Sequence, residues 1–391
     1  MLRKRYTSGL ITLFLLSVIL INAEEKQEEG YSFSDFIEIP HTSIKDQGRT
    51  GTCWDFATIS FLESEAMRKN DLDSIDLAEM YPVRWTYVDK ARNYVRLHGN
   101  TTFGQGGQAH DVLMQMEDYG LVPEKDFQSY RIDEEFNHRE VADILRGLLN
   151  GLLDGRTITN KKWLDAYNAV LNVYFGDEVE SFDYNGKQYT PRKFMVEFLK
   201  LDPQDYIEIV SCSHKPFYEQ VRLEVPDNWN FNDKYYNVPV DEMQQIVDVA
   251  LDKGYSVCWD ADVSDEYFDY QDTCVAFVPQ TELEEEDEDI KLPAEEKQIT
   301  RKIRQKAYNT FNTTDDHLMH IVGAARDQRG NNFYKIKNSW GTDSKYEGYY
   351  YISVPYFKLR TINIMVNKEV LQGKMKRKLG IKSGLFSISG N

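Results

Sequence analysis

Two residues near the start of the chain have the types and spacing needed for thiol chemistry. Gln47 lies six residues before Cys53 in the run DQGRTGTCWDF, residues 46–56. A cysteine acts as a nucleophile in its thiolate form, and a helix N-terminus or a neighbouring imidazolium lowers the pKa of a thiol. The side-chain amide of Gln47 and the backbone N–H of Cys53 are candidate donors to a negatively charged oxygen. The run therefore predicts a nucleophile with an oxyanion donor.

The residues around Cys53 predict the element that presents this thiol. After Cys53, apolar residues recur every three or four positions, and neither Gly nor Pro occurs before Asn70. This spacing predicts one amphipathic helix that begins near Cys53. Gly48 and Gly51 leave the preceding loop free to bring backbone amides close to a substrate carbonyl. A buried structural cysteine is the alternative interpretation, because free cysteines are commonly buried.

A second segment, residues 314–341, supplies a candidate base. His317 lies in an alternating, strand-like run, a polar turn follows at residues 328–332, and a second strand leads to Asn338. A hairpin would bring His317 and Asn338 side by side. The asparagine amide would then fix the tautomer of the imidazole, and Trp340 would shield their hydrogen bond from water. Together with Cys53, these residues favour nucleophilic catalysis.

The two segments resemble the motifs of a known family. GTCWDF resembles the cysteine signature of papain-like cysteine peptidases, and KNSWG resembles their asparagine signature. The resemblance is closer to the bleomycin hydrolase and bacterial aminopeptidase C branch, and it extends through runs such as YPVRWTYVDKARNYVRLHG, GGQAHDVL and YYNVPVDEM. This branch implies an α+β, papain-like two-lobe fold, with a helical lobe, a β-barrel-like lobe and a helical insertion.

The resemblance also implies the catalytic roles. Cys53 would be the nucleophile, and His317 would be the general base and then the general acid. Asn338 would orient the histidine, and Gln47 would be the oxyanion donor. His317 matches the family spacing better than His320 does, and strand alternation puts the two imidazoles on opposite faces, so that only one can meet the thiol.

Four further residues are candidates for substrate binding by the same resemblance. Gly106 and Gly107 resemble the glycine pair along which papain-like enzymes hold the substrate backbone, although a plain turn is the alternative. Trp340 is a third candidate. In bleomycin hydrolase-like enzymes the C-terminal carboxylate meets the free α-amine of the substrate, which makes Asn391 the fourth. A disordered basic tail is the alternative there, because the tail runs beyond the end of several bacterial relatives.

The implied function is an exported cysteine peptidase, an aminopeptidase that acts on short peptides. A papain-like endopeptidase with an open cleft and a non-catalytic binding or assembly protein are the alternatives. The family implies peptide substrates and a homo-oligomer, a hexamer. The composition is that of a globular protein, with 41% hydrophobic residues, and the net charge of −18 should repel nucleic acid. Without a clustered His/Cys set, neither a metal nor another cofactor is expected.

The N-terminal residues indicate export. Arg3, Lys4 and Arg5 precede an apolar run at residues 10–21 and then Ala23, which is the pattern of a signal peptide. The run is too short for a span of about 20 residues, so no stable membrane span is expected after cleavage. A periplasmic or extracellular location follows. With Cys53 a free thiol, the three other cysteines cannot all pair, and no essential disulfide is expected.

The chain is expected to be organised in six parts. They are a signal peptide, a leader, a helical lobe with the cysteine, an insertion for oligomerisation, a β-rich lobe with the histidine and asparagine, and a C-terminal arm, at residues 1–23, 24–35, 36–130, 131–240, 241–366 and 367–391. Within the insertion, an apolar stripe from Val141 to Leu152 predicts a helix. Another helix is predicted at Asp241–Lys253, where Gly254 stops it.

Overall fold

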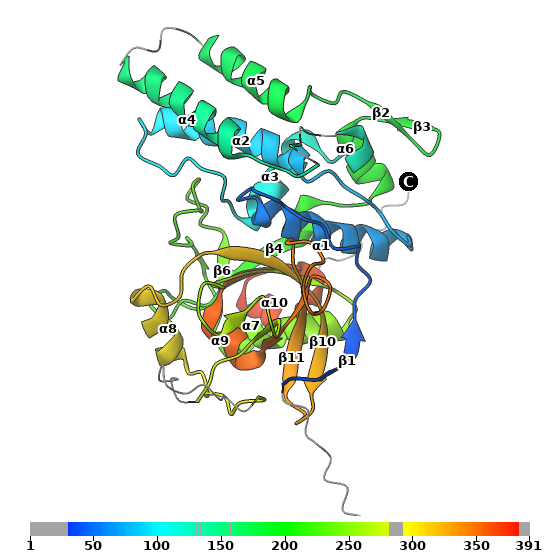
Figure 1. Cartoon of the computed structure of the whole chain (residues 1–391), viewed down its shortest axis with the longest axis vertical. Helices are drawn as coiled ribbons and strands as arrows, with labels where there is room; N and C mark the ends of the chain where they lie inside the picture. Colours follow the sequence, from blue (N-terminus) through cyan, green and yellow to red (C-terminus); the bar gives the residue numbers. More distant parts are fainter. Residues whose placement is uncertain are drawn as a thin grey trace, which may run out of the picture.

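The computed structural model of this chain describes residues 30–382, apart from residues 128, 130, 133, 156, 157, 159, 161 and 281–291. The predicted signal peptide, the first half of the predicted leader and Asn391 therefore lie outside the described residues. Helices form one lobe and a large sheet forms the core of the other (Figure 1). The predicted α+β, two-lobe fold is confirmed. Among the described residues, no helix is both long and apolar enough to cross a bilayer.

The helical lobe comes from the first half of the chain. Its helices are α1 (Cys53–Asn70), α2 (Met80–Arg96), α3 (Ala109–Tyr119), α4 (Arg139–Asp154), α5 (Lys162–Phe175) and the short α6 (Pro191–Lys193). A small hairpin of β2 (Phe182–Tyr184) and β3 (Lys187–Tyr189) belongs to the same part of the chain. In α4, the predicted stripe places Val141, Leu145 and Leu149 in the lobe's core, whereas Ile144 is exposed.

The other lobe is built on one mixed sheet, with eleven strands in the described part of the chain. Its strands, in order across the sheet, are β5 (Gln220–Val221), β6 (Tyr235–Asn237), β4 (Tyr206–Val210), β13 (Thr361–Asn367), β7 (Val257–Ala261), β10 (His317–Asp327), β11 (Asn332–Lys337), β12 (Tyr349–Ser353), β9 (Val275–Ala276) and β8 (Phe268–Asp269), and β1 (Phe33–Glu38) also pairs with β10. The helices of this lobe are α7 (Val240–Asp252), α8 (Arg301–Asn309), α9 (Val354–Arg360) and α10 (Gly373–Lys378).

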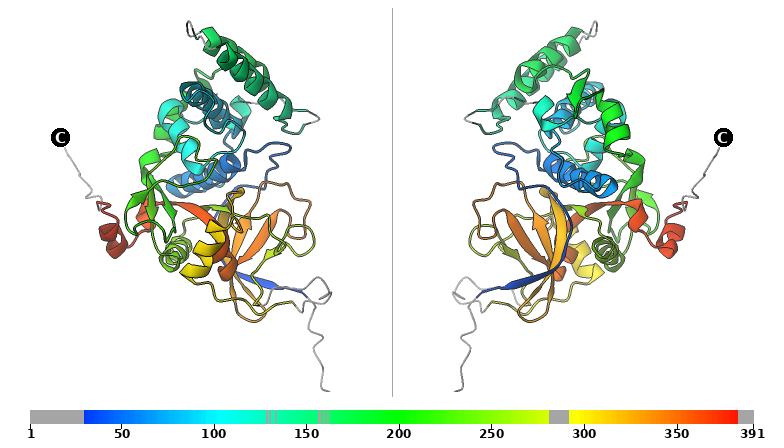
Figure 2. Two further views of the ribbon diagram at one scale, coloured as in Figure 1. Left: turned by 90° about the vertical axis from the view of Figure 1, so that its left-hand side faces the viewer. Right: turned by 90° about the vertical axis from the view of Figure 1, so that its right-hand side faces the viewer.

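Helix α1 lies along the boundary between the lobes, as the two side views show (Figure 2). It begins at Cys53 and ends at Asn70, as the sequence predicts, but it is not amphipathic. Every residue from Cys53 to Met67 is buried, because α2 and α3 pack on one side of the helix and β7 and β10 pack on the other. Two of its acidic residues, Glu63 and Glu65, accept hydrogen bonds inside the protein. Glu63, for example, accepts from the Thr42 hydroxyl at 2.5 Å and the Leu77 N–H at 2.9 Å.

The segment predicted as an insertion divides between the two lobes. Its helices α4 and α5 join the helical core, whereas its strands β4, β5 and β6 join the sheet. The apolar faces of α4 and α5 are buried against each other and against α2, so they do not form a separate core. Strand β1 likewise starts within the predicted leader and belongs to the β lobe. The predicted boundaries at residues 131 and 240 therefore do not separate packed units.

Arg304, on α8, joins three separate segments of the β lobe. The side chain is buried, and its guanidinium donates hydrogen bonds to the carbonyl oxygens of Ser211 at 3.1 Å, Lys358 at 2.9 Å and Thr361 at 2.5 Å. These acceptors follow β4, belong to α9 and begin β13, respectively. The guanidinium is planar and carries several N–H donors, so this one side chain can donate to three backbone carbonyl oxygens.

Replacing Arg304 with methionine should therefore destabilise the protein without touching the boundary between the lobes. The variant leaves buried carbonyl oxygens without donors, and we expect the free energy of unfolding to fall by about 2–4 kcal/mol. Urea denaturation measures this change. Lys302→Met, at an exposed position on the same helix, is the control and should change stability by less than about 0.5 kcal/mol. Equal stability of the two variants would contradict the structural role of Arg304.

Candidate active site

Cys53 is the first residue of α1 and lies where this helix meets β10. Its side chain is almost completely buried, and the backbone N–H of Leu318 donates toward its sulfur. Leu318 directly follows His317, so the thiol lies next to the start of the strand that carries the candidate base. The helical lobe thus supplies the candidate nucleophile, and the β lobe supplies the candidate base and Leu318 beside it.

His317 is held in one orientation by two neighbours. Its Nε2 lies 2.7 Å from the Oδ1 of Asn338, and because a carbonyl oxygen only accepts, Nε2 carries the hydrogen. Trp340 stacks on the ring, with 4.5 Å between the ring centroids. The other ring nitrogen, Nδ1, is therefore the one with a free lone pair, which can accept a proton. Trp340, predicted to bind substrate and to shield this bond, contacts the imidazole of His317, the candidate base.

The environment keeps both reacting groups uncharged. Burial, and to a lesser extent the carboxyl groups of Asp260, Asp315 and Asp227, raise the pKa of the Cys53 thiol to about 12, although the hydrogen bond from the Leu318 N–H opposes this shift. Burial also lowers the pKa of His317 to about 4, although its bond to Asn338 opposes this shift. The sequence predicted the opposite direction for the thiol, from the helix N-terminus and an imidazolium. The direction differs because burial disfavours the charged thiolate and the three nearby acids add to this effect.

Gln47 is fixed by the residues that follow the candidate orienting asparagine. Its backbone N–H donates to the carbonyl of Ser339 at 2.9 Å, and the Ser339 hydroxyl donates to its Oε1 at 2.7 Å. Its Nε2 donates one hydrogen to the carbonyl of Thr50 at 2.7 Å, and an amide nitrogen carries a second hydrogen that can serve an oxyanion. The Ser339 N–H also donates to the Oδ1 of Asn338 at 2.8 Å.

Ser339 was not among the residues predicted for the site. Ser339 contacts both Asn338, the candidate orienting residue, and Gln47, the candidate oxyanion donor. It therefore connects the two parts of the candidate site. Its place in the KNSWG run was the signal that could have identified it. Ser339 is a positioning residue.

The glycine pair has a different environment from the one predicted. A side chain at Gly106 would overlap the carboxylate of Asp227, so this carboxylate occupies the space expected for a substrate backbone. A side chain at Gly107 would lie 2.7 Å from Asp111 and 3.0 Å from the ring of Trp54. At both positions, neighbouring side chains occupy the space that a larger residue would need.

His320 lies at the lobe boundary, where it faces α1. Its Nδ1 is 2.9 Å from the hydroxyl of Ser60, on the second turn of α1, and the side chain is fully buried. Its strand neighbours Met319 and Ile321 point to the core of the β lobe, as alternation along β10 requires. His320 thus faces α1, and the structure places the two histidines in separate surroundings.

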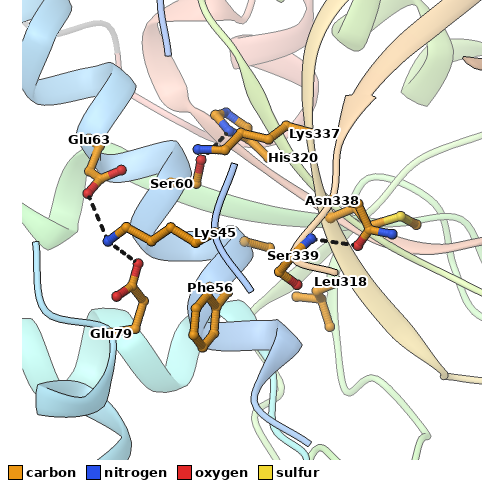
Figure 3. Close-up of a pocket in the computed structure, with 12 residues that line it drawn as sticks. Lys45, Phe56, Ser60, Glu63, Glu79, Leu318, His320, Lys337, Asn338 and Ser339 are labelled. Carbon is orange, nitrogen blue, oxygen red and sulfur yellow. Dashed lines mark hydrogen bonds and ion pairs between the residues drawn. The ribbon is translucent and has the colours of Figure 1, made fainter. Parts of the chain in front are cut away.

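A small polar cavity lies beside His320, between α1 and the strand end that carries Asn338 (Figure 3). Lys45 enters it from the loop before Gln47 and forms ion pairs with Glu79 at 2.5 Å and Glu63 at 3.9 Å. Lys337 donates to Thr42, the hydroxyl that in turn donates to Glu63. These contacts tie the loop of Gln47 and the strand of Asn338 to the same helix, as the close-up shows for the Lys45 ion pairs.

Comparisons with known proteins agree with this geometry. Residues 94–383, which include His317 and Asn338, match the model of the peptidase C1-like family. Aminopeptidase G of Lactobacillus delbrueckii subsp. lactis is 23% identical over 381 residues, which cover 85% of this chain and 83% of that protein. Aminopeptidase C of Streptococcus thermophilus is 23% identical over 396 residues, which cover 89% of this chain and 85% of that protein.

A solved structure shares the fold. The crystal structure of PepW from Lactobacillus rhamnosis HN001 matches 89% of this chain and 84% of its own, with a TM-score of 0.72 and 17% sequence identity. The likeness therefore covers both lobes. The chain belongs to the peptidase C1-like family, and its enzyme class is cysteine-type peptidase.

Proposed function

We propose that this peptidase is an aminopeptidase that removes N-terminal residues from short peptides through a thioester on Cys53. The observation that carries the chemistry is the His317 ring, oriented by Asn338 at 2.7 Å, at the start of the strand whose next backbone N–H reaches the thiol. The relatives named aminopeptidase G and aminopeptidase C, each similar over more than four fifths of this chain, support the exopeptidase mode.

The proposed reaction begins from a neutral thiol and a neutral imidazole. As the Cys53 sulfur bonds to the substrate carbonyl carbon, its proton passes to Nδ1 of His317, and the carbonyl oxygen gains the negative charge. The side-chain amide of Gln47 and the backbone N–H of Cys53 donate to this oxygen. The carbonyl then re-forms, the C–N bond breaks, and the imidazolium gives its proton to the departing amine.

Hydrolysis of the thioester completes the cycle. A water molecule gives a proton to Nδ1 of His317 and bonds to the acyl carbon, and the C–S bond breaks. The sulfur recovers the proton from the imidazolium, so the amino acid leaves and the neutral pair is restored. Throughout, Asn338 holds Nε2–H, which keeps Nδ1 as the atom that moves protons.

Two further features are proposed from the sequence. The first 23 residues support export to the periplasm or the extracellular space, and the branch to which the motifs are similar supports assembly into a hexamer. An endopeptidase with an open cleft and a binding protein on a peptidase scaffold are the other functions that the site residues allow.

The first prediction concerns the roles of the two histidines. Cys53→Ala and His317→Ala should each reduce kcat for peptide hydrolysis by about 10³-fold or more, because they remove the nucleophile and its base. His320→Gln keeps an amide near Ser60 and should retain activity within about threefold, even if its melting temperature falls. Steady-state kinetics on folded variants measures this. A binding protein would show no hydrolysis in the wild type.

The second prediction tests the exopeptidase mode. Short peptides with a free α-amine should be cleaved at least about tenfold faster, by kcat/KM, than the same peptides with an acetylated N-terminus, because an aminopeptidase recognises the terminal ammonium group. Mass spectrometry of the products should show single residues released from the N-terminus. Faster cleavage of the acetylated series, or cuts inside the peptides, would establish the endopeptidase alternative.

The third prediction follows from the lowered pKa of His317. The imidazole of His317 stays neutral above about pH 4, so it can act as a base there. An ordinary histidine, with a pKa of about 6.5, would already be protonated at pH values below 6.5. We therefore expect the rate of Cys53 alkylation by iodoacetamide to stay at its base-assisted level below that pH. The acid limb of the rate should have its midpoint near pH 4. Circular dichroism at each pH checks that the protein stays folded. A midpoint near pH 6.5 would contradict the structure's account of this group.

A further inference from the structure

We propose that the segment between β5 and β6, residues 222–234, limits the length of the acyl part of the substrate, and that the side chain of Asp227 is a steric stop against Gly106. We call residues 222–234 the crossing segment. This inference rests on the proposed aminopeptidase function and deepens it, because it names a residue that restricts cleavage to the N-terminal end of a peptide. The family resemblance gives the contact with that end to the C-terminal residue, Asn391.

The four bonds of the attacked carbon indicate where the acyl part of the substrate lies. In the proposed reaction, this carbon is bonded to the Cys53 sulfur, its oxygen faces Gln47, and the departing nitrogen faces His317, which gives it a proton. The fourth bond leads to the Cα atom of the acyl residue, and it must point to the remaining side of the thiol. We therefore place the acyl part along the loop of the helical lobe that carries the glycine pair.

This loop packs directly against the residues that flank Cys53. The Gly51 N–H donates to Oε1 of Gln105 at 2.8 Å, and the Trp54 Nε1–H donates to the carbonyl of Gln105 at 2.9 Å. A side chain on Gly107 would lie 3.0 Å from the ring of Trp54. The backbone of the loop therefore borders the thiol, and an acyl chain that leaves the thiol on this side runs along it.

Asp227 closes this path at Gly106. The three atoms nearest to the position of a side chain on Gly106 are Oδ2, Cγ and Oδ1 of Asp227. All three belong to the carboxyl group, so this group is in direct contact with the glycine backbone. It takes the space that a further residue of a longer acyl chain would need, and a steric clash of this kind discriminates against the longer substrate.

Trp229 fixes the crossing segment on the helical lobe. Its side chain is buried, and its Nε1–H donates to Oδ2 of Asp111 on α3 at 2.9 Å. Its backbone carbonyl accepts from the side-chain amide of Asn93 on α2 at 2.9 Å and from the Thr101 hydroxyl at 3.1 Å. Because the segment starts at β5 and ends at β6, it passes from the β lobe to the helical lobe and back. A buried aromatic ring with three hydrogen bonds holds the stop in place before substrate arrives.

Lys90 connects the stop to the glycine loop. Its ammonium group donates to the carbonyl of Gly106 and lies 5.9 Å from the ring centroids of both Trp54 and Trp229. Lys90 is buried, and its positive charge attracts the carboxylate of Asp227. The glycine loop, the start of α1 and the crossing segment are therefore held around one cation, which fixes their relative positions.

The experiment varies the volume of residue 227 and the length of the acyl part independently. Asp227→Ala removes all three atoms that contact Gly106, whereas Asp227→Asn keeps the size of the side chain and removes its charge. The substrates are aminoacyl, dipeptidyl and tripeptidyl coumarin amides, each with a free α-amine. Mass spectrometry of the products distinguishes direct release of a dipeptide from two successive cuts that each release one residue.

The readout is the ratio of kcat/KM for direct release of dipeptides to kcat/KM for release of single residues. We expect this ratio to be about 0.01 or less in wild type and to rise at least about tenfold in Asp227→Ala, because the smaller side chain opens the path. Asp227→Asn should keep the wild-type ratio. The matched control is Asp233→Ala, at an exposed position on the same segment, which should behave like wild type.

Two further variants make the test sharper. Trp229→Phe removes the hydrogen bond to Asp111 and should raise the same ratio about threefold, because it loosens the crossing segment. A variant that ends at residue 382 tests the C-terminal residues as the alternative stop. Circular dichroism checks that each variant is folded.

Three results would overturn the inference. They are an unchanged ratio in both Asp227→Ala and Trp229→Phe, an equal rise in Asp227→Asn, which would assign the effect to charge, and a rise only when the C-terminal residues are removed. Failure of the proposed function itself has a different signature, since wild type would then release internal fragments of peptides as fast as single N-terminal residues.

Discussion

The packing of α1 against β10 is the contact on which the rest of the site depends. The thiol comes from one lobe and the imidazole from the other, so no local segment can bring them together. A cysteine and a histidine exchange a proton only at hydrogen-bonding distance, and a shift of about 1 Å at the boundary would separate them. Burial of α1 on both sides, from Cys53 to Met67, leaves the helix little freedom to move. Because α1 has no exposed face from Cys53 to Met67, the packing on both sides fixes the position of the thiol.

Charged side chains inside this boundary make the packing of the two lobes more specific. Lys45 pairs with buried Glu79, while burial lowers the pKa of Lys337 to about 8, which shows how far the boundary is removed from water. Buried ion pairs add little net stability, because desolvation offsets their attraction. Their distances and directions are specific, however, and here they connect the loop before Gln47 with the strand before Asn338. The network therefore fixes the register of the two lobes more than it stabilises them.

Local patterns in the sequence predicted the parts of the site that are close together in the chain. The start of α1 at Cys53 and the hairpin that sets His317 beside Asn338 follow from spacing alone, and the helix predicted at 241–253 is α7 (Val240–Asp252). The bond between Ser339 and Gln47 could not be predicted, because it joins residues 292 positions apart. Asp260 became part of the site only through the register of β7 with β10, which no local pattern specifies.

The direction of the thiol pKa was wrong for the same reason. A helix N-terminus is visible in the sequence, whereas burial and acids from distant segments are not, and here they dominate. A neutral resting pair has a chemical consequence. In this resting state the sulfur is a weak nucleophile, because burial and the three acids raise the cost of its negative charge. In the proposed mechanism the proton therefore leaves the sulfur only as the bond to the carbonyl carbon forms, and the oxyanion donors stabilise a charge that the surroundings of the thiol disfavour.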